Sequence, residues 1–175
     1  MEIFRSIGTD RMAFLAGKVS AYSWVGEGSS FMLSDILAAL VNIQMDQIDI
    51  INKNRSHIAS EYTKSFAPYT DRVQLPVVPA GMTTPNRHIY ALKFTTASMQ
   101  ERFIQEMRKR RVEVSSHYVP LHNSPMGVKL GGGKRGLPVT EETAKTIVRM
   151  PIYAGMTARE LAYTITSAQK VLKAL

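Results

Sequence analysis

The feature that most constrains the fold of this chain is a helical pattern over residues 34–66. Ser34 is a good N-cap, and Asp35 places a negative charge where the helix dipole is positive. Apolar residues then recur at steps of three and four, as on one face of an α-helix: Leu37, Leu40, Val41, Ile48, Ile51, Ile58, Tyr62 and Phe66. We therefore expect one long helix that begins at Ser34 and forms the spine of a domain.

The two halves of this pattern differ in polarity. The first half, Ile36 to Met45, is apolar on nearly every side, whereas the second half carries polar and charged residues on one side. A helix that is apolar all round is buried from several directions. A chain of 175 residues can form one domain with its own core. We expect another domain or subunit to cover the first half of the helix.

The remaining sequence predicts short elements around this spine. We expect an irregular lead-in with a helical turn over 10–17, and strands over 73–78, 87–94 and 112–119. One helix should run from the capping box Ser98–Glu101 to Arg111, and another from Thr140 to Arg149. An extended piece over 150–153 should lead to a last helix that begins at the capping box Thr157–Glu160. The order strand, helix, strand over 87–119 predicts a right-handed crossover between neighbouring parallel strands. Residues 120–138 form a loop, whose Gly131–Gly136 segment lacks P-loop spacing. The expected class is α+β, with a small sheet covered by helices.

Composition limits the class of protein. No run approaches the ~20 apolar residues that cross a bilayer, and the N-terminus lacks a signal-peptide layout. The absence of cysteine excludes disulfides and thiolate metal sites. We therefore expect a cytoplasmic protein with no membrane partner. The net charge of +8 favours anionic partners, but no nucleic-acid module is recognisable, so we expect no nucleic-acid partner.

Three motifs narrow the interpretation. Tyr22-Ser-Trp24 precedes Gly28-Ser-Ser-Phe-Met-Leu-Ser-Asp-Ile-Leu-Ala-Ala39, in which a glycine and two serines lead into the helix start. Such a turn can bind an anion such as a phosphate, although ordinary loop chemistry explains it as well. The other motifs are Arg5-Ser-Ile-Gly-Thr-Asp-Arg11 and His117-Tyr-Val-Pro-Leu-His122.

In this order, the three motifs resemble segments of the pyridoxal-phosphate-dependent sugar-nucleotide aminotransferases of the DegT/DnrJ/StrS family. Within the family, the patterns are nearest to those of the TDP-4-oxo-6-deoxyglucose 4-transaminases, which serve surface polysaccharide (lipopolysaccharide or common antigen) biosynthesis. The resemblance implies that residues 34–175 are the C-terminal small domain of a fold-type I pyridoxal phosphate aminotransferase. Residues 1–33 would then be a lead-in from a missing cofactor-binding domain.

The resemblance also implies where the chemistry lies. Pyridoxal phosphate needs a lysine that holds it as a Schiff base and an acidic partner for its pyridine nitrogen. In the family, both precede the region found here, and the lysine lies upstream of a Gly-Glu-Gly-Gly pattern that this chain lacks. None of the lysines that we considered stands in the expected setting: Lys18, Lys53, Lys64 and Lys93. We expect no catalytic residue in this chain, and a fragment that is inactive alone and uses pyridoxal 5'-phosphate only with the missing N-terminal domain.

Ser30 is the candidate cofactor-binding residue. The resemblance implies that its hydroxyl reaches the cofactor phosphate of the neighbouring subunit. The alternative is that Ser30 only satisfies the helix start.

Four residues are candidates for binding the substrate. His117, Tyr118 and His122 follow the strand predicted over 112–119, and the resemblance implies that they approach the cofactor and the sugar nucleotide. Imidazoles there could bind phosphate or transfer protons, whereas a half-buried loop histidine is the alternative for His117. His88 is the fourth candidate, from its Asn-x-His setting. No metal site is expected, because His117 and His122 lack a third ligand.

The partners implied are the missing N-terminal domain or its split half, a second copy in a homodimer, and a nucleotide-sugar substrate. An alternative from another class is a non-catalytic, self-associating α/β interaction module, which the missing lysine favours. Tyr22 and Trp24 could pack near the cofactor or anchor the lead-in on the long helix, and we favour the anchoring.

Overall fold

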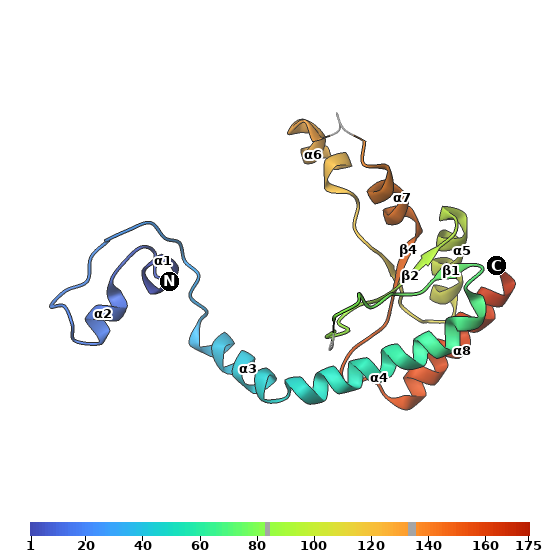
Figure 1. Cartoon of the computed structure of the whole chain (residues 1–175), viewed down its shortest axis with the longest axis horizontal. Coiled ribbons are helices and arrows are strands. Elements are labelled where there is room, and N and C mark those ends of the chain that lie inside the picture. Colours follow the sequence, from blue (N-terminus) through green and yellow to red (C-terminus); the bar gives the residue numbers. More distant parts are fainter. Residues whose placement is uncertain (83–84, 133–135) are drawn as a thin grey trace. The chain divides into compact units, whose positions relative to one another are not determined.

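The computed structural model describes residues 1–82, 85–132 and 136–175 (Figure 1). The chain divides into two compact units, Met1–Ile48 and Asp49–Leu175, which we describe separately. Residues 133–135 of the expected surface loop Gly131–Gly136 lie outside the described residues.

The first unit begins with a folded-back lead-in. Its short helices are α1 (Glu2–Arg5) and α2 (Arg11–Leu15), and the second of them confirms the helical turn predicted over 10–17. Isolated antiparallel bridges join Ser6 to Ser30 and Thr9 to Trp24. The lead-in is thus tied by backbone pairing to the turn that precedes the long helix.

Gly28 is required where these two segments meet. A Cβ atom added to Gly28 would collide with the Gly8 amide nitrogen and lie 2.5 Å from the Phe4 carbonyl oxygen. Gly8 itself has a φ of +74°, a conformation that side chains other than hydrogen rarely adopt. The glycine of the Gly-Ser-Ser motif therefore permits close backbone approach.

The favoured anchoring role of the aromatic pair is wrong for Trp24. This residue is 77% exposed. Tyr22 contacts Phe14 of α2 instead, with ring centroids 5.7 Å apart. The prediction failed because the bridge between Thr9 and Trp24 fixes the backbone at this point, and the indole ring is left exposed to solvent.

Helix α3 (Asp35–Asp46) begins where the sequence predicts. The Leu37 amide donates to the Ser34 side-chain oxygen at 3.4 Å, which confirms the N-cap. No residue of α3 is buried, and Ile36 is 77% exposed. The apolar half of the predicted spine therefore has no cover within the first unit, Met1–Ile48.

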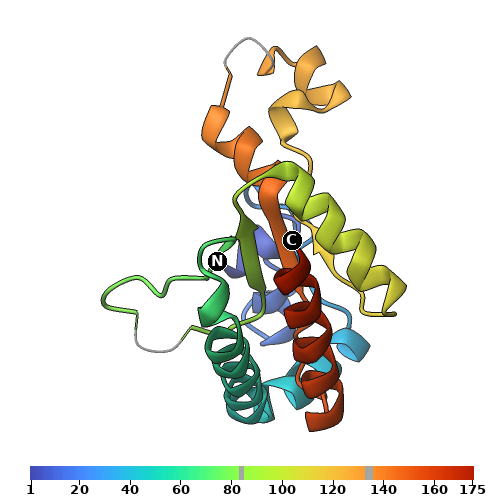
Figure 2. The ribbon, with the colours of Figure 1, turned by 90° about the vertical axis from the view of Figure 1, so that its right-hand side faces the viewer.

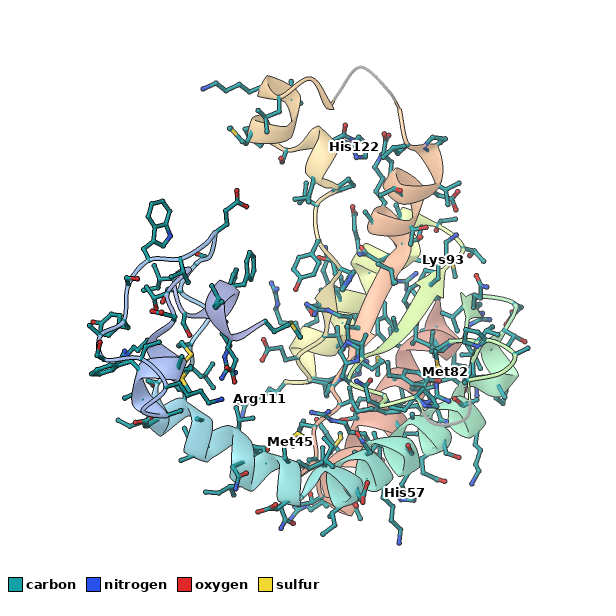
Figure 3. The ribbon with its side chains drawn as sticks, turned by 60° about the vertical axis from the view of Figure 1, so that its left-hand side comes forward. Met45, His57, Met82, Lys93, Arg111 and His122 are labelled. Atoms are coloured by element: carbon teal, nitrogen blue, oxygen red, sulfur yellow. The ribbon has the colours of Figure 1, made fainter. Side chains whose placement is uncertain are left out.

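The prediction of one continuous helix over 34–66 is wrong. The Gln47 amide donates to the Gln44 carbonyl at 3.2 Å, a tighter i→i−3 bond that ends α3. Helix α4 (Ile48–Phe66) follows, and it buries Ile58, Ala59, Tyr62 and Phe66. The second unit therefore has α4 alone as its spine. His57 of α4 is exposed (Figure 3), as expected for a residue on the polar side.

A four-stranded sheet lies beside α4 in the second unit. The strands are β1 (Val73–Gln74), β2 (Tyr90–Phe94), β3 (Ser115–Ser116) and β4 (Ile147–Met150), in the order β1-β2-β4-β3 with every neighbouring pair antiparallel. Since β2 and β3 are both antiparallel to β4, they are parallel to each other. The predicted crossover between neighbouring strands is wrong, because β4 lies between them.

Three further boundaries differ from the predictions. Helix α5 (Ala97–Lys109) is capped by Thr96 and not by the expected box at Ser98: the Met99 amide donates to Thr96 Oγ1 at 3.2 Å. Helix α7 (Pro138–Thr146) starts before Thr140 and ends before the β-branched pair that opens β4. The strands predicted over 73–78 and 112–119 keep only two paired residues each.

The predicted loop over 120–138 contains two short helices, η2 (Leu121–Asn123) and α6 (Pro125–Lys129). A 3-10 helix, η1 (Ala67–Tyr69), follows α4. The last helix, α8 (Ala158–Ala174), confirms its predicted capping box: Glu160 N–H donates to Thr157 Oγ1 at 3.2 Å, and Thr157 N–H donates to a Glu160 carboxylate oxygen at 2.8 Å.

One face of the sheet builds the core. Tyr90, Leu92 and Phe94 of β2 are buried together with Val148 and Met150 of β4 against residues from the helices, which include Tyr62, Phe66, Phe103, Met107, Ala168, Val171 and Leu172. Figure 2 shows α4 and α8 side by side, and Gln169 Nε2 of α8 donates to the Ser65 carbonyl of α4 at 3.0 Å. The fold is the α+β class that the sequence predicts. The other face, hereafter the open face, carries Ala91, Lys93, Ile147 and Arg149.

Candidate functional site

The open face of the sheet borders a cavity of about 580 Å³ in the second unit. Its walls come from the segment before β2, the segment before β3, the end of β4 and the start of α8. The charged and polar residues that line it include His88, Arg111, Glu113, Ser115, Arg149 and Glu160. We call it the larger cavity.

The alternation of the segment before β3 explains which side chains reach this cavity. Val112 and Val114 are buried in the core, so the residues between and beside them point to the opposite side. Ser115 of β3 lies directly opposite Arg149 of β4 in the ladder, and paired residues share a face of a sheet. Arg111 has a φ of 56° at the end of α5, and its side chain is labelled in Figure 3.

A smaller cavity of about 330 Å³ lies beyond β3 and contains two of the sequence-predicted residues. His117 and Tyr118 both line it, with their ring centroids 4.6 Å apart. The guanidinium carbon of Arg149 lies 5.5 Å from the centre of the Tyr118 ring. Arg149 therefore links the two cavities, since it lines one and contacts a wall residue of the other.

Two nitrogen atoms in this region are buried and lack a hydrogen-bond partner among the described residues: Arg149 Nε and His117 Nδ1. A buried polar atom without a partner costs about 1–3 kcal/mol. Such groups are few in native proteins and each calls for an explanation, of which an absent ligand is one.

His122 reaches the smaller cavity only through a carboxylate. Its Nε2 atom lies 2.9 Å from Glu141 Oε1, and Glu141 lines that cavity. The Leu137 amide donates to the same carboxylate oxygen at 3.1 Å. The hydrogen bond from His122, followed by that from the Leu137 amide, lowers the pKa of Glu141. His122, labelled in Figure 3, thereby ties η2 to the start of α7.

His88 lies apart from the other two predicted histidines. It is exposed, its Nδ1 atom lies 2.7 Å from Asn86 Oδ1, and it lines the larger cavity. The structure thus brings His117, Tyr118 and, through Glu141, His122 to the smaller cavity, and His88 to the larger one.

Ser30 belongs to the first unit and is described on its own. It is exposed and is held by its backbone bridge to Ser6. The Ser29 amide donates to the Phe4 carbonyl at 2.9 Å, so one of the amides that the sequence offered to an anion is already used. The Ser30 hydroxyl itself makes no hydrogen bond within the part of the chain that the structure describes.

Arg149 was not among the residues predicted from the sequence. A sequence feature could have indicated it: a single arginine interrupts the apolar run Ile-Val-Arg-Met-Pro-Ile over 147–152. A charge in such a run has to face away from the core. Arg111 was predicted only as the end of the helix that starts at Ser98, and only the fold shows that it lines the larger cavity.

Comparison with known proteins decides the family. The family model of the DegT/DnrJ/EryC1/StrS aminotransferases matches residues 1–169. This chain belongs to that family. A dTDP-3-amino-3,4,6-trideoxy-alpha-D-glucose transaminase of Streptomyces venezuelae is 27% identical over 143 residues, which cover 81% of this chain and 36% of the relative.

Solved structures show the same fold. PseC of Helicobacter pylori, an aminotransferase involved in pseudoaminic acid biosynthesis, has a TM-score of 0.83 at 18% identity, covering 99% of this chain and 45% of its own. The putative sugar aminotransferase Spr1654 of Streptococcus pneumoniae, in its PMP form, has a TM-score of 0.77 at 20% identity, covering 99% and 42%. The chain thus spans less than half the length of these relatives of the family.

Among the residues described, no helix is both long and apolar enough to cross a membrane.

Proposed function

We propose that this chain is the C-terminal part of a pyridoxal-phosphate-dependent aminotransferase that acts on a keto-sugar nucleotide in the cytoplasm, in surface polysaccharide biosynthesis. The family match over residues 1–169 carries this proposal. The chain would be inactive alone, because the lysine that anchors the cofactor lies in the missing N-terminal domain. When bound, pyridoxal phosphate would serve as the electron sink and carrier for the transferred amino group.

The residues present fit one part of this cofactor. The Ser30 hydroxyl is exposed and free within the described residues, and a hydroxyl can donate to a phosphate oxygen. This supports a phosphate contact made by Ser30 to a cofactor held elsewhere in the assembly.

The same residues do not fit the covalent attachment of the cofactor. An anchoring lysine works with its amine desolvated or beside another cation. No described lysine lines the larger cavity, and the smaller one is lined by Lys145, which is exposed. Lys93 and Lys64 are engaged with Glu142 and Glu61, at 3.3 and 3.0 Å. These observations support the proposal that another part of the protein supplies the lysine.

The second unit would supply substrate contacts. His88, His117 and Tyr118 line the two cavities, and His122 positions Glu141 at the smaller one. Imidazole, phenol and hydroxyl groups around cavities of about 580 and 330 Å³ suit a polar ligand such as a nucleotide sugar.

Helix α3 would carry the partner. Its exposed apolar residues, Ile36, Leu37, Leu40, Val41, Ile43 and Met45, are between 50% and 77% exposed. A contiguous apolar surface of this kind is typical of an interface, here with the missing N-terminal domain or with a second copy of the chain in a homodimer. The alternative of a non-catalytic, self-associating module shares this observation, so activity has to distinguish the two.

The test joins the chain in frame to the coding sequence that precedes it in its genome, and assays amino transfer from glutamate to a TDP-keto-sugar. We expect activity from the joined protein and none from either half alone. Activity of the isolated chain, or an inactive joined protein that binds pyridoxal phosphate normally, would contradict the proposal. An inactive chain that only self-associates would favour the interaction module.

A further inference from the structure

We propose that the edge of the sheet at β3 is a docking site for an extended, acidic segment of a partner protein, which pairs with the backbone of residues 113–116 and places carboxylates on Arg108 and Arg111. The surface lies within the second unit. Arg111 also lines the larger cavity, so the docked segment would lie beside it. This docking goes beyond the proposed transamination and does not depend on it.

Strand β3 ends the sheet on one side. In the order β1-β2-β4-β3 it pairs with β4, and no other strand among the described residues lies on its other side. Every second residue of such an edge strand turns its N–H and C=O groups away from the sheet, where an added strand can bind them. An extended peptide that pairs there gains affinity from main-chain hydrogen bonds.

A groove of about 510 Å³, hereafter the edge groove, borders this edge. It is lined by two residues of α5 and by the segment that leads into β3: Ile104, Arg108, Arg111, Val112, Glu113, Val114, Ser115 and Ser116. Ile104 is half-buried and packs against the core, so the edge groove has an apolar wall. Since side chains of a strand alternate in direction, a docked strand presents one set to this wall and the other to the charged residues.

The backbone of Arg111 has a conformation that is unfavourable for an arginine. Helix α5 ends in a Schellman motif, in which the Arg111 amide donates to the Arg108 carbonyl at 2.9 Å and the Val112 amide donates to the Met107 carbonyl at 3.0 Å. Arg111 has a φ of 56°, and glycine is the usual residue at this place in the motif. An arginine in a glycine position, despite the strain, supports a role for its side chain.

The charge of the edge groove selects an acidic partner. Within the described residues, neither Arg108 nor Arg111 forms an ion pair with a carboxylate, whereas the neighbouring Lys109 lies 2.6 Å from Glu106. Among the described residues that line the groove, Glu113 alone is acidic. The two guanidinium groups therefore leave the groove with a net positive charge, and each matches the two oxygens of a carboxylate.

A second copy of the chain fits this surface less well than an acidic partner. The chain carries a net charge of +8, and pairing of two β3 edges would bring two positively charged grooves together. Like charges on adjacent strands are destabilising. An added strand that carries carboxylates removes this repulsion.

The docking site can be tested on the chain with a short fluorescent peptide that alternates glutamate and valine. We expect saturable binding that raises the anisotropy of the peptide and slows hydrogen exchange of the amides in residues 113–116. R108Q/R111G should weaken binding about tenfold, since two charge contacts are lost, and added salt should weaken binding to the wild type. Glycine suits the positive φ of residue 111, so this variant should fold. K53Q/R102Q removes two charges from exposed positions on α4 and α5 and should leave binding unchanged.

Two further peptides separate backbone pairing from charge. A fully N-methylated version has no amide donors, and a version with lysine in place of glutamate has the opposite charge. Both should bind at least tenfold more weakly than the parent peptide. If either binds as tightly as the parent, or if R108Q/R111G binds like the wild type, the proposal is overturned.

Two other results would also overturn the proposal. Exchange at residues 113–116 that slows as the concentration of the chain alone rises would assign the edge to a second copy. No binding of the acidic peptide would leave the charges as protection of an exposed edge against unspecific pairing. None of these measurements requires transamination, so the proposed function stands or falls separately.

Discussion

The starts of helices α5 and α8 each depend on a single threonine hydroxyl group. Thr96 and Thr157 each accept a hydrogen bond from the amide three residues later, and in α8 the Glu160 carboxylate also accepts one from the Thr157 amide. These bonds satisfy amides that the helix itself leaves without a partner. For α5, the sequence predicts Ser98 as the N-cap, whereas the structure shows Thr96 in that position. The two residues can therefore be compared directly by substitution.

Replacing Thr96 by alanine should therefore lower the free energy of unfolding by about 1 kcal/mol, because the Met99 amide loses its acceptor. Ser98→Ala is the matched control, since Ser98 Oγ only lies 3.1 Å from Thr96 Oγ1 and caps no amide. Urea unfolding of the two variants gives the comparison. A larger loss for Ser98→Ala would restore the capping box that the sequence suggested.

Glu141 should make stability depend on pH in the acidic range. The hydrogen bond from His122 lowers its pKa below the ordinary 4.5, so the carboxylate stabilises the folded state above that value. This contribution is lost as the pH falls through the lowered pKa. An NMR titration of the Glu141 carboxyl carbon should give a midpoint below 4.5, and the midpoint should rise in H122Q. A midpoint at or above 4.5 in the wild type would disprove the link between η2 and α7.

The elements of the second unit are held together by aromatic packing across the sheet. Phe94 of β2 and Phe103 of α5 lie with their ring centroids 4.9 Å apart, and both are buried. Tyr62 of α4 packs on Tyr90 of β2 with ring centroids 5.1 Å apart, and its hydroxyl donates to the Pro151 carbonyl at 2.7 Å. Burial raises the pKa of Tyr62.

Phe103→Ala should cost about 3–5 kcal/mol, because it removes a fully buried ring and leaves a cavity between α5 and β2. Phe31→Ala, at a position that is 60% exposed in the first unit, should cost far less. Thermal unfolding followed by circular dichroism measures both. Similar losses for the two variants would mean that the described core does not carry the stability of the second unit.

Sequence reasoning found the elements whose periodicity is strong. The amphipathic pattern and capping box of α8 are local features, and both were predicted correctly. It failed where pairing with a neighbouring strand determines the secondary structure. Ile147 and Val148 continue the pattern of α7, but their pairing with Lys93 and Leu92 makes them a strand. The end of α3 at Gln47 carries no proline or glycine, so the apolar period concealed it.

Part of the candidate site could likewise be predicted from the sequence. His117 and Tyr118 stood out as part of a contiguous motif, and the structure places both at one cavity. Arg149 is 31 residues away from Tyr118 by number, and only the antiparallel pairing of β3 with β4 brings them together. A site assembled across strands cannot be found from spacing along the sequence.

At the scale of the whole molecule, the decisive surface is that of α3, whose apolar residues are all exposed. Ile36→Glu should leave the stability of the chain nearly unchanged, since this side chain is 77% exposed, but it should weaken association with the N-terminal half or a second copy. Analytical ultracentrifugation of the co-expressed halves measures the association. Gln44→Glu adds the same charge at a polar, exposed position of α3 and is the control. Equal association of both variants would exclude the apolar side of α3 as the interface.

The most direct test asks which part of the protein holds the cofactor. The chain alone and the joined protein are each incubated with pyridoxal phosphate, reduced with borohydride, digested and examined by mass spectrometry. We predict one stoichiometric pyridoxyl group in the joined protein, on a lysine that precedes this chain, and none on the chain alone. A stoichiometric pyridoxyl group on a lysine of this chain, such as Lys145, would contradict the account.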